Sequence, residues 1–196
     1  MIWIMFYGAA ASNSDGPSAT GTLSMKSLLL SFIFAILSTQ VLAEGRHHAT
    51  SRYIGEAGRE VKSLSEADVD ELTRGDGWGL AKPAELNGYP GPSHVLAMKN
   101  QIGLTDDQFQ KVQQVFDLMQ ARASAEGRIF VDAERKLDAA FRSRTITETA
   151  LGDLVAEAEA SRSRLRFIHL AAHLEVAQVL DPGQIAIYEE HRGYSK

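Results

Sequence analysis

The sequence predicts an all-α protein built around one long antiparallel helical hairpin with short flanking helices. Two long segments carry apolar residues at spacings of three and four, which is typical of amphipathic helices. Only residues 143–146 separate these segments, so the two helices are expected to fold back on each other. No segment shows strand-like alternation of useful length.

Composition narrows the class of protein. The chain has 196 residues, which suggests one domain with room for an appended segment, and 44% of its residues are hydrophobic. Its formal charge of -5 argues against a nucleic-acid partner. Cysteine is absent, which excludes disulfides, thiolate nucleophiles and cysteine-ligated zinc.

Residues 25–43 are typical of a secretory signal peptide. Lys26 precedes an apolar run over residues 28–37, and Val41 and Ala43 occupy the positions that a signal peptidase reads. Cleavage is expected after Ala43, which predicts a periplasmic protein with no stable membrane insertion after cleavage. The alternative is an uncleaved anchor, although the run is shorter than the about 20 residues of a span.

Residues 1–24 form a doubtful N-terminal extension. Met1 to Ala11 is apolar and lacks a basic residue, and residues 12–24 contain serine, glycine, threonine and proline. A signal peptide seldom has such a prefix, so translation starting at Met25 is the alternative.

Residues 44–93 are expected to contain a short helix and an ordered loop. The helix is predicted from Ala57 to Thr73, with Ser65 and Asp68 as an internal start signal and Gly75 as the stop. Residues 74–93 combine turn-forming glycine and proline with four large apolar residues: Trp78, Leu80, Leu86 and Tyr89. This composition favours a loop packed on a helical surface, and its role is left open.

Residues 94–196 are predicted to form the hairpin domain. A short helix from His94 to Gln101, ended at Gly103, precedes the first long helix, Asp106 to Arg142. The apolar stripe of that long helix consists of Phe109, Val112, Phe116, Met119, Ala123, Phe130, Leu137 and Phe141.

The second long helix is predicted from Thr147 to Leu180, and a last short helix reaches about Arg192. The stripe of the second long helix consists of Leu151, Leu154, Val155, Ala158, Leu165, Ile168, Ala172, Val176 and Val179. Asp181 and Pro182 stop it and start the last helix.

Two related pentapeptides flank the hairpin. The first is Leu104-Thr105-Asp106-Asp107-Gln108, and the second is Leu180-Asp181-Pro182-Gly183-Gln184. In each, leucine anchors the preceding segment, Thr105 or Asp181 caps the helix, and Gln108 or Gln184 reaches back to the cap.

With these two motifs the chain resembles the Spy/CpxP (LTxxQ) family, in particular its periplasmic heavy-metal sensor and refolding chaperone branch. The resemblance covers residues 94–194, and the second copy departs from the family pattern with Asp181 for threonine and Gly183 for glutamate. It implies a hooked hairpin that forms a homodimer and works without ATP. The implied activities are holding unfolded proteins in envelope stress, binding a metal, or modulating a membrane signalling protein.

His169 and His173 are the candidate metal ligands. Their spacing of four places both imidazoles on one helical face, a workable pair for zinc, nickel, cobalt or copper. Further ligands would come from His94, Glu175 or the His47-His48 arm. The alternative is that both histidines are structural, and no cofactor is then required.

Phe167, Leu170 and Leu174 lie opposite the main stripe of the second helix. A helix that is apolar on two sides contacts something besides its hairpin partner. A dimer seam or packing of the 78–92 loop is favoured over a surface for unfolded clients. Arg142, Arg144, Arg162, Arg164 and Arg166 could add a basic patch nearby.

No HExxH, P-loop or GxSxG motif is present in the sequence, and no acid pair comes with a pocket signature. We therefore expect a protein that is not an enzyme.

Overall fold

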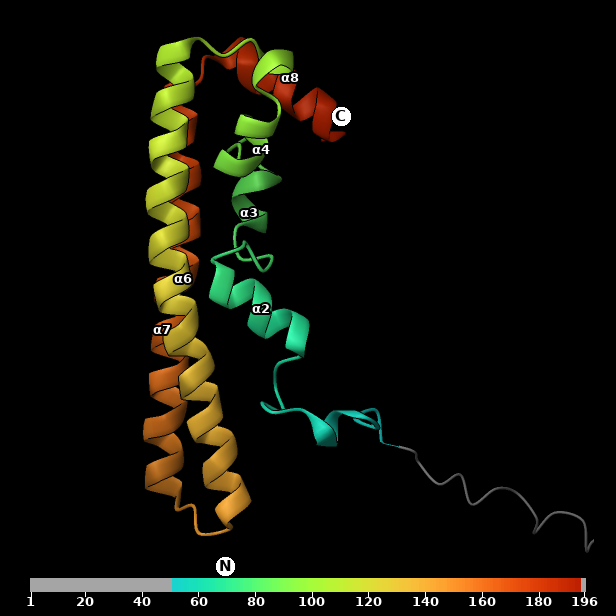
Figure 1. Ribbon diagram of the computed structural model, residues 1–196, viewed down its shortest axis with the longest axis vertical. Coiled ribbons are helices and arrows are strands. Elements are labelled where there is room, and N and C mark those ends of the chain that lie inside the picture. The colour runs from blue at the N-terminus through green and yellow to red at the C-terminus, as the bar shows by residue number, and fades with distance from the viewer. Residues whose placement is uncertain (1–50, 195–196) are drawn as a thin grey trace, which may run out of the picture. The chain divides into compact units, whose positions relative to one another are not determined.

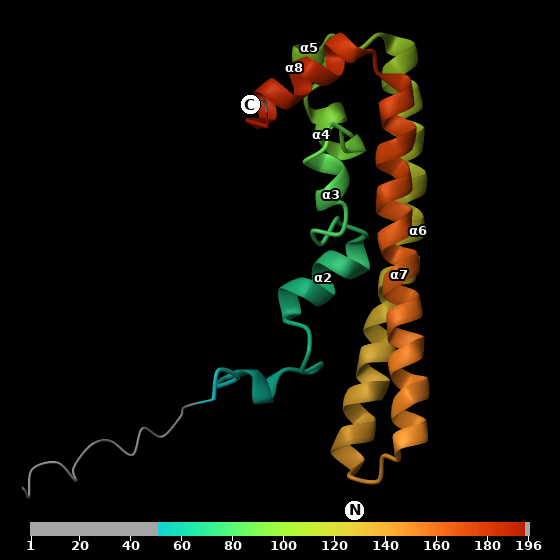
Figure 2. The same ribbon diagram turned by 180° about the vertical axis from the view of Figure 1, so that it is seen from behind.

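The structure, a computed structural model, describes residues 51–194, and every regular element among them is a helix (Figure 1). The two long helices, α6 (Asp106–Ser143) and α7 (Glu148–Val179), pack along each other in opposite directions, as Figures 1 and 2 both show. The predicted all-α hairpin is therefore confirmed. The predicted extension (1–24), signal peptide (25–43) and His47-His48 arm lie outside the described residues.

The predicted helix from Ala57 to Thr73 is wrong in its first half. A single 3₁₀ turn, η1 (Glu56–Gly58), is followed by irregular chain, and helix α2 runs only over Glu66–Arg74. Ser65 has extended backbone angles, and its side chain accepts a hydrogen bond from the Asp68 amide while the Asp68 carboxylate accepts one from the Ser65 amide. This reciprocal cap starts the helix at Glu66 and leaves Val61 and Leu64 to be buried in the core from irregular chain.

Helix α2 ends in very close contact with the middle of α6. A Cβ added to Gly127 would lie 2.1 Å from the Leu72 carbonyl oxygen, so only glycine fits at this crossing. The Ser124 hydroxyl donates to the Thr73 carbonyl at 2.6 Å, which satisfies one of the last carbonyls of α2. Gly75, in the left-handed region at φ 78°, then turns the chain away from the helix.

The predicted ordered loop is the next part of the chain, and we call residues 75–94 the side segment. It contains one helical turn, α3 (Lys82–Glu85), and contacts α7. The single helix expected from His94 to Gln101 is two short helices, α4 (Pro92–Ala97) and α5 (Lys99–Ile102). Met98, at φ -104° and ψ 18°, interrupts them, and proline at the first helical position starts α4 earlier than expected.

The two pentapeptides meet at the base of the hairpin. Thr105 caps α6 and Asp181 caps α8 (Pro182–Arg192), each in a reciprocal capping box with the glutamine three residues later. Gln108 Nε2 donates to the Val179 carbonyl at 2.9 Å and to Gln184 Oε1 at 2.8 Å, and Gln184 Nε2 reaches Gln108 Oε1 at 3.0 Å. Each motif therefore completes the hydrogen bonds of the other.

The buried residues form two clusters. One lies under α2 and the start of the side segment and contains Leu72, Phe130 and Leu165, and the other lies at the base and contains Val112, Val176 and Tyr188. Two residues of the predicted stripes are exposed: Phe141 at 55% and Val155 at 42%. Two helices alone bury only a narrow strip, and in the described residues the short helices contact the hairpin away from its tip (Figures 1 and 2). No described helix is long and apolar enough to cross a membrane.

Candidate functional site

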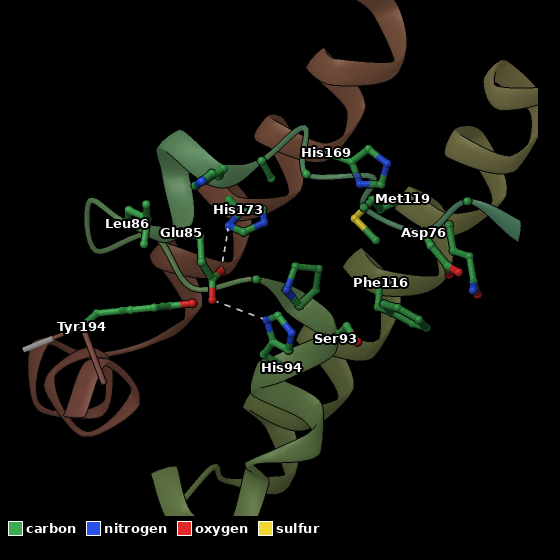
Figure 3. Close-up of a pocket in the computed structure, with 18 residues that line it drawn as sticks. Asp76, Glu85, Leu86, Ser93, His94, Phe116, Met119, His169, His173 and Tyr194 are labelled. Atoms are coloured by element: carbon green, nitrogen blue, oxygen red, sulfur yellow. Dashed lines mark ion pairs between the residues drawn. The ribbon is translucent and has the colours of Figure 1, made fainter. Parts of the chain in front are cut away.

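A cavity of about 520 Å³ lies between the side segment and the two long helices. Phe116, Met119 and Gln120 from α6 and His169 and His173 from α7 line it. The side segment supplies much of the rest of the wall, where Gly75, Gly77, Gly79 and Gly91 contribute backbone without side chains. In Figure 3, His169, Met119 and Phe116 lie on one side of the cavity and Glu85, His173 and His94 on the other.

His169 is the most buried polar group in the cavity wall, at 2% exposure. Among the described residues, its Nε2 is the one buried side-chain nitrogen or oxygen without a hydrogen-bond partner. Burial, together with nearby His173, lowers the pKa of His169 below its ordinary value. The ring is therefore neutral at neutral pH, and one of its nitrogens has an unmet hydrogen-bonding capacity.

His173 is held in a defined orientation. Its Nδ1 lies 2.7 Å from the Tyr89 carbonyl oxygen and donates to it, which fixes the orientation of the ring. The ring packs on Gly91, where an added Cβ would lie 2.9 Å from His173 Cε1. A side chain at position 91 would force either the ring or the side segment to move.

Glu85 connects the side segment to α7 and α8. Its carboxylate accepts a short hydrogen bond from the Tyr188 hydroxyl and another from Arg192 Nε at 3.2 Å. His94 Nδ1 lies 3.4 Å from Glu85 Oε1, and His173 Nδ1 lies 3.8 Å from Glu85 Oε2 (Figure 3). One carboxylate thus holds together three parts of the fold.

The pKa values around Glu85 follow from this burial and charge. Burial raises the pKa of Tyr188, and the neighbouring Glu85 carboxylate raises it further. Burial lowers the pKa of His94, and the nearby Arg192 guanidinium adds to that effect. At neutral pH, Tyr188 is a hydrogen-bond donor and His94 is an uncharged imidazole.

The structure brings together only part of the predicted metal site. His169, His173 and His94 line one cavity, whereas Glu175 is exposed and lines a different groove. Within residues 51–194, no group of three or more His, Cys, Asp or Glu side chains is arranged to hold a metal ion. Metal binding at His169 and His173 therefore stays a prediction.

Sequence reasoning missed Glu85 as a partner of these histidines. The carboxylate predicted from the sequence was Glu175, close to His173 in the chain, whereas the carboxylate near the His173 ring is Glu85 of the side segment, about 90 positions earlier. In the sequence, Glu85 is marked only by being a charged residue among the apolar and turn-forming residues of the side segment.

The predicted second apolar face of α7 is covered only at its edge. Leu170 is half-buried, whereas Phe167 is 71% exposed and Leu174 is 52% exposed. A shallow groove between α7 and α6 is lined by Phe167, Leu118 and Arg122. We call Leu118, Phe167 and Leu174 the outer face of the hairpin.

The predicted basic patch is mostly neutralised by acidic neighbours. Arg164 pairs with Glu126 at 2.8 Å, Arg162 pairs with Glu159 at 3.6 Å, and Arg142 pairs with Asp138. Arg162 also lies over the Trp78 ring, 6.0 Å from its centroid. The outer face is therefore more apolar than basic.

The fold and the cavity define the class of protein: a helical hairpin with a side pocket and an uncovered apolar face. No protein-family model matches this chain, and neither a curated protein nor a solved structure matches it.

Proposed function

We propose that this chain is a periplasmic, ATP-independent chaperone or envelope-stress accessory protein of the Spy/CpxP type. The signal-peptide pattern and the two pentapeptides support the compartment and the class, and both come from the sequence. The single observation that carries the activity is the outer face, where Phe167 is 71% exposed, Leu174 is 52% exposed and Leu118 is 49% exposed.

The outer face suits loose binding of apolar segments. Covering a Phe or Leu side chain is worth about 1.5–3 kcal/mol, so a few such contacts give weak binding that can be reversed without an energy source. The occupant we propose is an apolar segment of an unfolded protein, because a shallow groove with few polar groups does not demand one defined partner sequence.

An aggregation assay tests this function. The purified protein should suppress aggregation of a denatured client at a near-stoichiometric ratio without nucleotide. The double substitution Phe167→Ser and Leu174→Ser should reduce that suppression several-fold while the helical circular dichroism remains.

The matched control is Tyr53→Ser with Ile54→Ser, an exposed aromatic and aliphatic pair in the N-terminal part of the described chain, at 64% and 68% exposure. This control should behave as the parent. No suppression by the parent with several clients would contradict the chaperone proposal. Unchanged suppression by the outer-face variant would show that the outer face does not bind clients.

The homodimer is tested on the same two variants. If light scattering finds the parent dimeric and the outer-face variant monomeric with full chaperone activity, the outer face is the dimer seam instead. If the parent and the outer-face variant are both dimers and the variant has lost only client binding, the outer face binds clients.

A second candidate function, sensing or buffering of a divalent transition metal, is favoured by one observation. The His173 Nδ1 donates to a backbone carbonyl, the arrangement that usually orients a metal-binding imidazole, and His169 Nε2 has no partner. Calorimetric titration with zinc, nickel, cobalt and copper should then show binding that is lost in His169→Ala with His173→Ala. The variant His191→Ala, an exposed histidine of α8, is the control.

Modulation of a membrane signalling partner stays a prediction of the resemblance. Crosslinking in cells would then recover one membrane protein instead of diverse clients.

A further inference from the structure

A second hollow, separate from the cavity described above, lies between the side segment and α7. The side segment lines it with Lys82, Leu86 and four other residues between positions 79 and 87, and α7 lines it with Arg166. Its volume of about 400 Å³ lies within the range of about 300–1,000 Å³ that is usual for small-molecule pockets. We call this hollow the cationic groove.

The two charged side chains of the cationic groove are both cations, one from each wall. Within residues 51–194, no ion pair and no side-chain hydrogen bond involves Lys82 or Arg166, whereas Arg162 and Arg164 on the same helix are each paired with a glutamate. No carboxylate is among the described residues that line the groove. The positive charge there is therefore not neutralised by the protein itself.

Lys82 also lines the larger cavity, whose carboxylates are Glu85 and Asp76. Both carboxylates are occupied elsewhere, because Glu85 accepts hydrogen bonds from Tyr188 and Arg192 and Asp76 is paired with the last arginine of α2 at 2.9 Å. An anion that enters the cationic groove would meet two cations with free hydrogen-bond donors and would approach no carboxylate in its lining.

The apolar part of the groove distinguishes an organic anion from an inorganic one. Leu86 is 52% exposed beside Lys82 in the lining, so a ligand with an apolar body would cover apolar surface that now faces solvent. A bare inorganic anion would gain only charge contacts, which water and salt weaken at exposed side chains such as Lys82 and Arg166.

We propose that the cationic groove binds a small organic anion, a carboxylate or phosphate on a short apolar body, with its charge held by Lys82 and Arg166 and its body against Leu86. The groove shares no lining residue with the groove of the outer face, so this site does not depend on chaperone activity.

Four probes test the proposal on the purified protein: octanoate, octan-1-ol, octylammonium and acetate, titrated at pH 7.5 and followed by amide chemical shifts. We expect octanoate to bind at least tenfold more tightly than the two probes without a negative charge and than acetate, which lacks the body. The largest shifts are expected at Gly79, Lys82 and Arg166, and binding should weaken as salt is added. No binding of octanoate, equal or tighter binding of another probe, or shifts confined to other parts of the chain would overturn the proposal.

A pair of double variants with the same change in net charge locates the binding. Lys82→Gln with Arg166→Gln should weaken octanoate binding at least tenfold. Arg52→Gln with Arg128→Gln removes two exposed cations that do not line the groove, and this control should bind as the parent. Equal affinities of the two double variants would contradict the site.

The same anion could come from a free metabolite or from a lipid headgroup, and vesicles of phosphatidylglycerol separate these sources. Sedimentation of the parent with the vesicles, lost in the Lys82 and Arg166 variant, would support a lipid source, and no sedimentation of the parent would support a free ligand. A hexaglutamate peptide that displaces octanoate at lower concentration than octyl phosphate does would mean that an acidic protein segment occupies the groove, and would overturn the proposal.

Discussion

The two ends of the hairpin are made from the same two helices but are stabilised differently. At the base, Gln108 and Gln184 exchange hydrogen bonds, and Tyr188 of α8 is 1% exposed, with its hydroxyl hydrogen-bonded to Glu85 of the side segment. At the tip, Phe141 is 55% exposed, and Arg144 turns the chain in the left-handed region at φ 55°. The comparison shows that amphipathic periodicity forms both long helices over their whole length. Which residues of their apolar stripes are buried depends on where the shorter elements pack on the hairpin.

The largest effect on stability is expected for Tyr188 at the base, and almost none for Phe141 at the tip. Tyr188→Ala removes a buried ring and its hydrogen bond to Glu85, so the free energy of unfolding should fall by about 3–5 kcal/mol. Phe141→Ala should change it by no more than about 0.5 kcal/mol. Urea denaturation followed by circular dichroism measures both, and comparable losses would show that the tip is as well packed as the base.

A smaller loss is expected from the glutamines. Gln184→Ala leaves the Gly103 carbonyl and the Asp181 amide without their partners at the base, which should cost about 2 kcal/mol. Gln113→Ala removes only a surface contact with Asp117 and should cost less than about 0.5 kcal/mol. Equal values in the same denaturation experiment would mean that the paired motifs do not stabilise the base.

A third prediction concerns pH. His169 and His94 have lowered pKa values in the folded protein, so the unfolded chain binds protons more readily. Their contribution to stability is complete above the unfolded pKa of about 6.5 and is lost as pH falls from there toward the folded values. His169→Phe should therefore weaken the decrease in stability between pH 7.5 and 5, and it should raise stability at pH 7.5 by about 1 kcal/mol because an unpartnered polar atom is removed. Denaturation at several pH values measures this, and an unchanged slope would contradict it.

The smallest effect is expected at the tip. Thr147 caps α7 through a hydrogen bond from the Ala150 amide at 3.3 Å, without the reciprocal side chain found at Thr105. Thr147→Ala should therefore cost about 0.5 kcal/mol and speed hydrogen exchange in the first turn of α7 only. Faster exchange at the base as well would show that the two ends unfold together.

Sequence patterns predicted the long helices well because their signals are local. Thr105, Thr147 and Asp181 precede the helices that they cap, and the periodicity runs through both long helices. The helix from Ala57 failed because the Ser65 cap, although recognised, was placed inside the helix and not at its start. The break at Met98 carries no glycine or proline, so no local signal marks it.

The candidate site was less predictable because it depends on distant residues. The spacing of His169 and His173 gives their shared helical face, but only the fold brings Glu85 and His94 to the same cavity. The positions of α2 and the side segment depend on close contacts of Gly127 with Leu72, of Gly75 with α6 and of Gly91 with His173. A single sequence does not show which glycines are needed for contact and which for turns.

The mutual hydrogen bonds of Gln108 and Gln184 restrict the length of each long helix relative to the other. α6 has 38 residues and α7 has 32, and both amides meet only when the two arms return to the base in register. One residue inserted into either arm would turn the rest of that helix by about 100° and advance it by about 1.5 Å, separating the amides. The two amides still meet if both helices are lengthened by about seven residues, or two turns. Longer or shorter versions of such a hairpin are therefore expected to carry equal insertions or deletions in both helices, next to the tip.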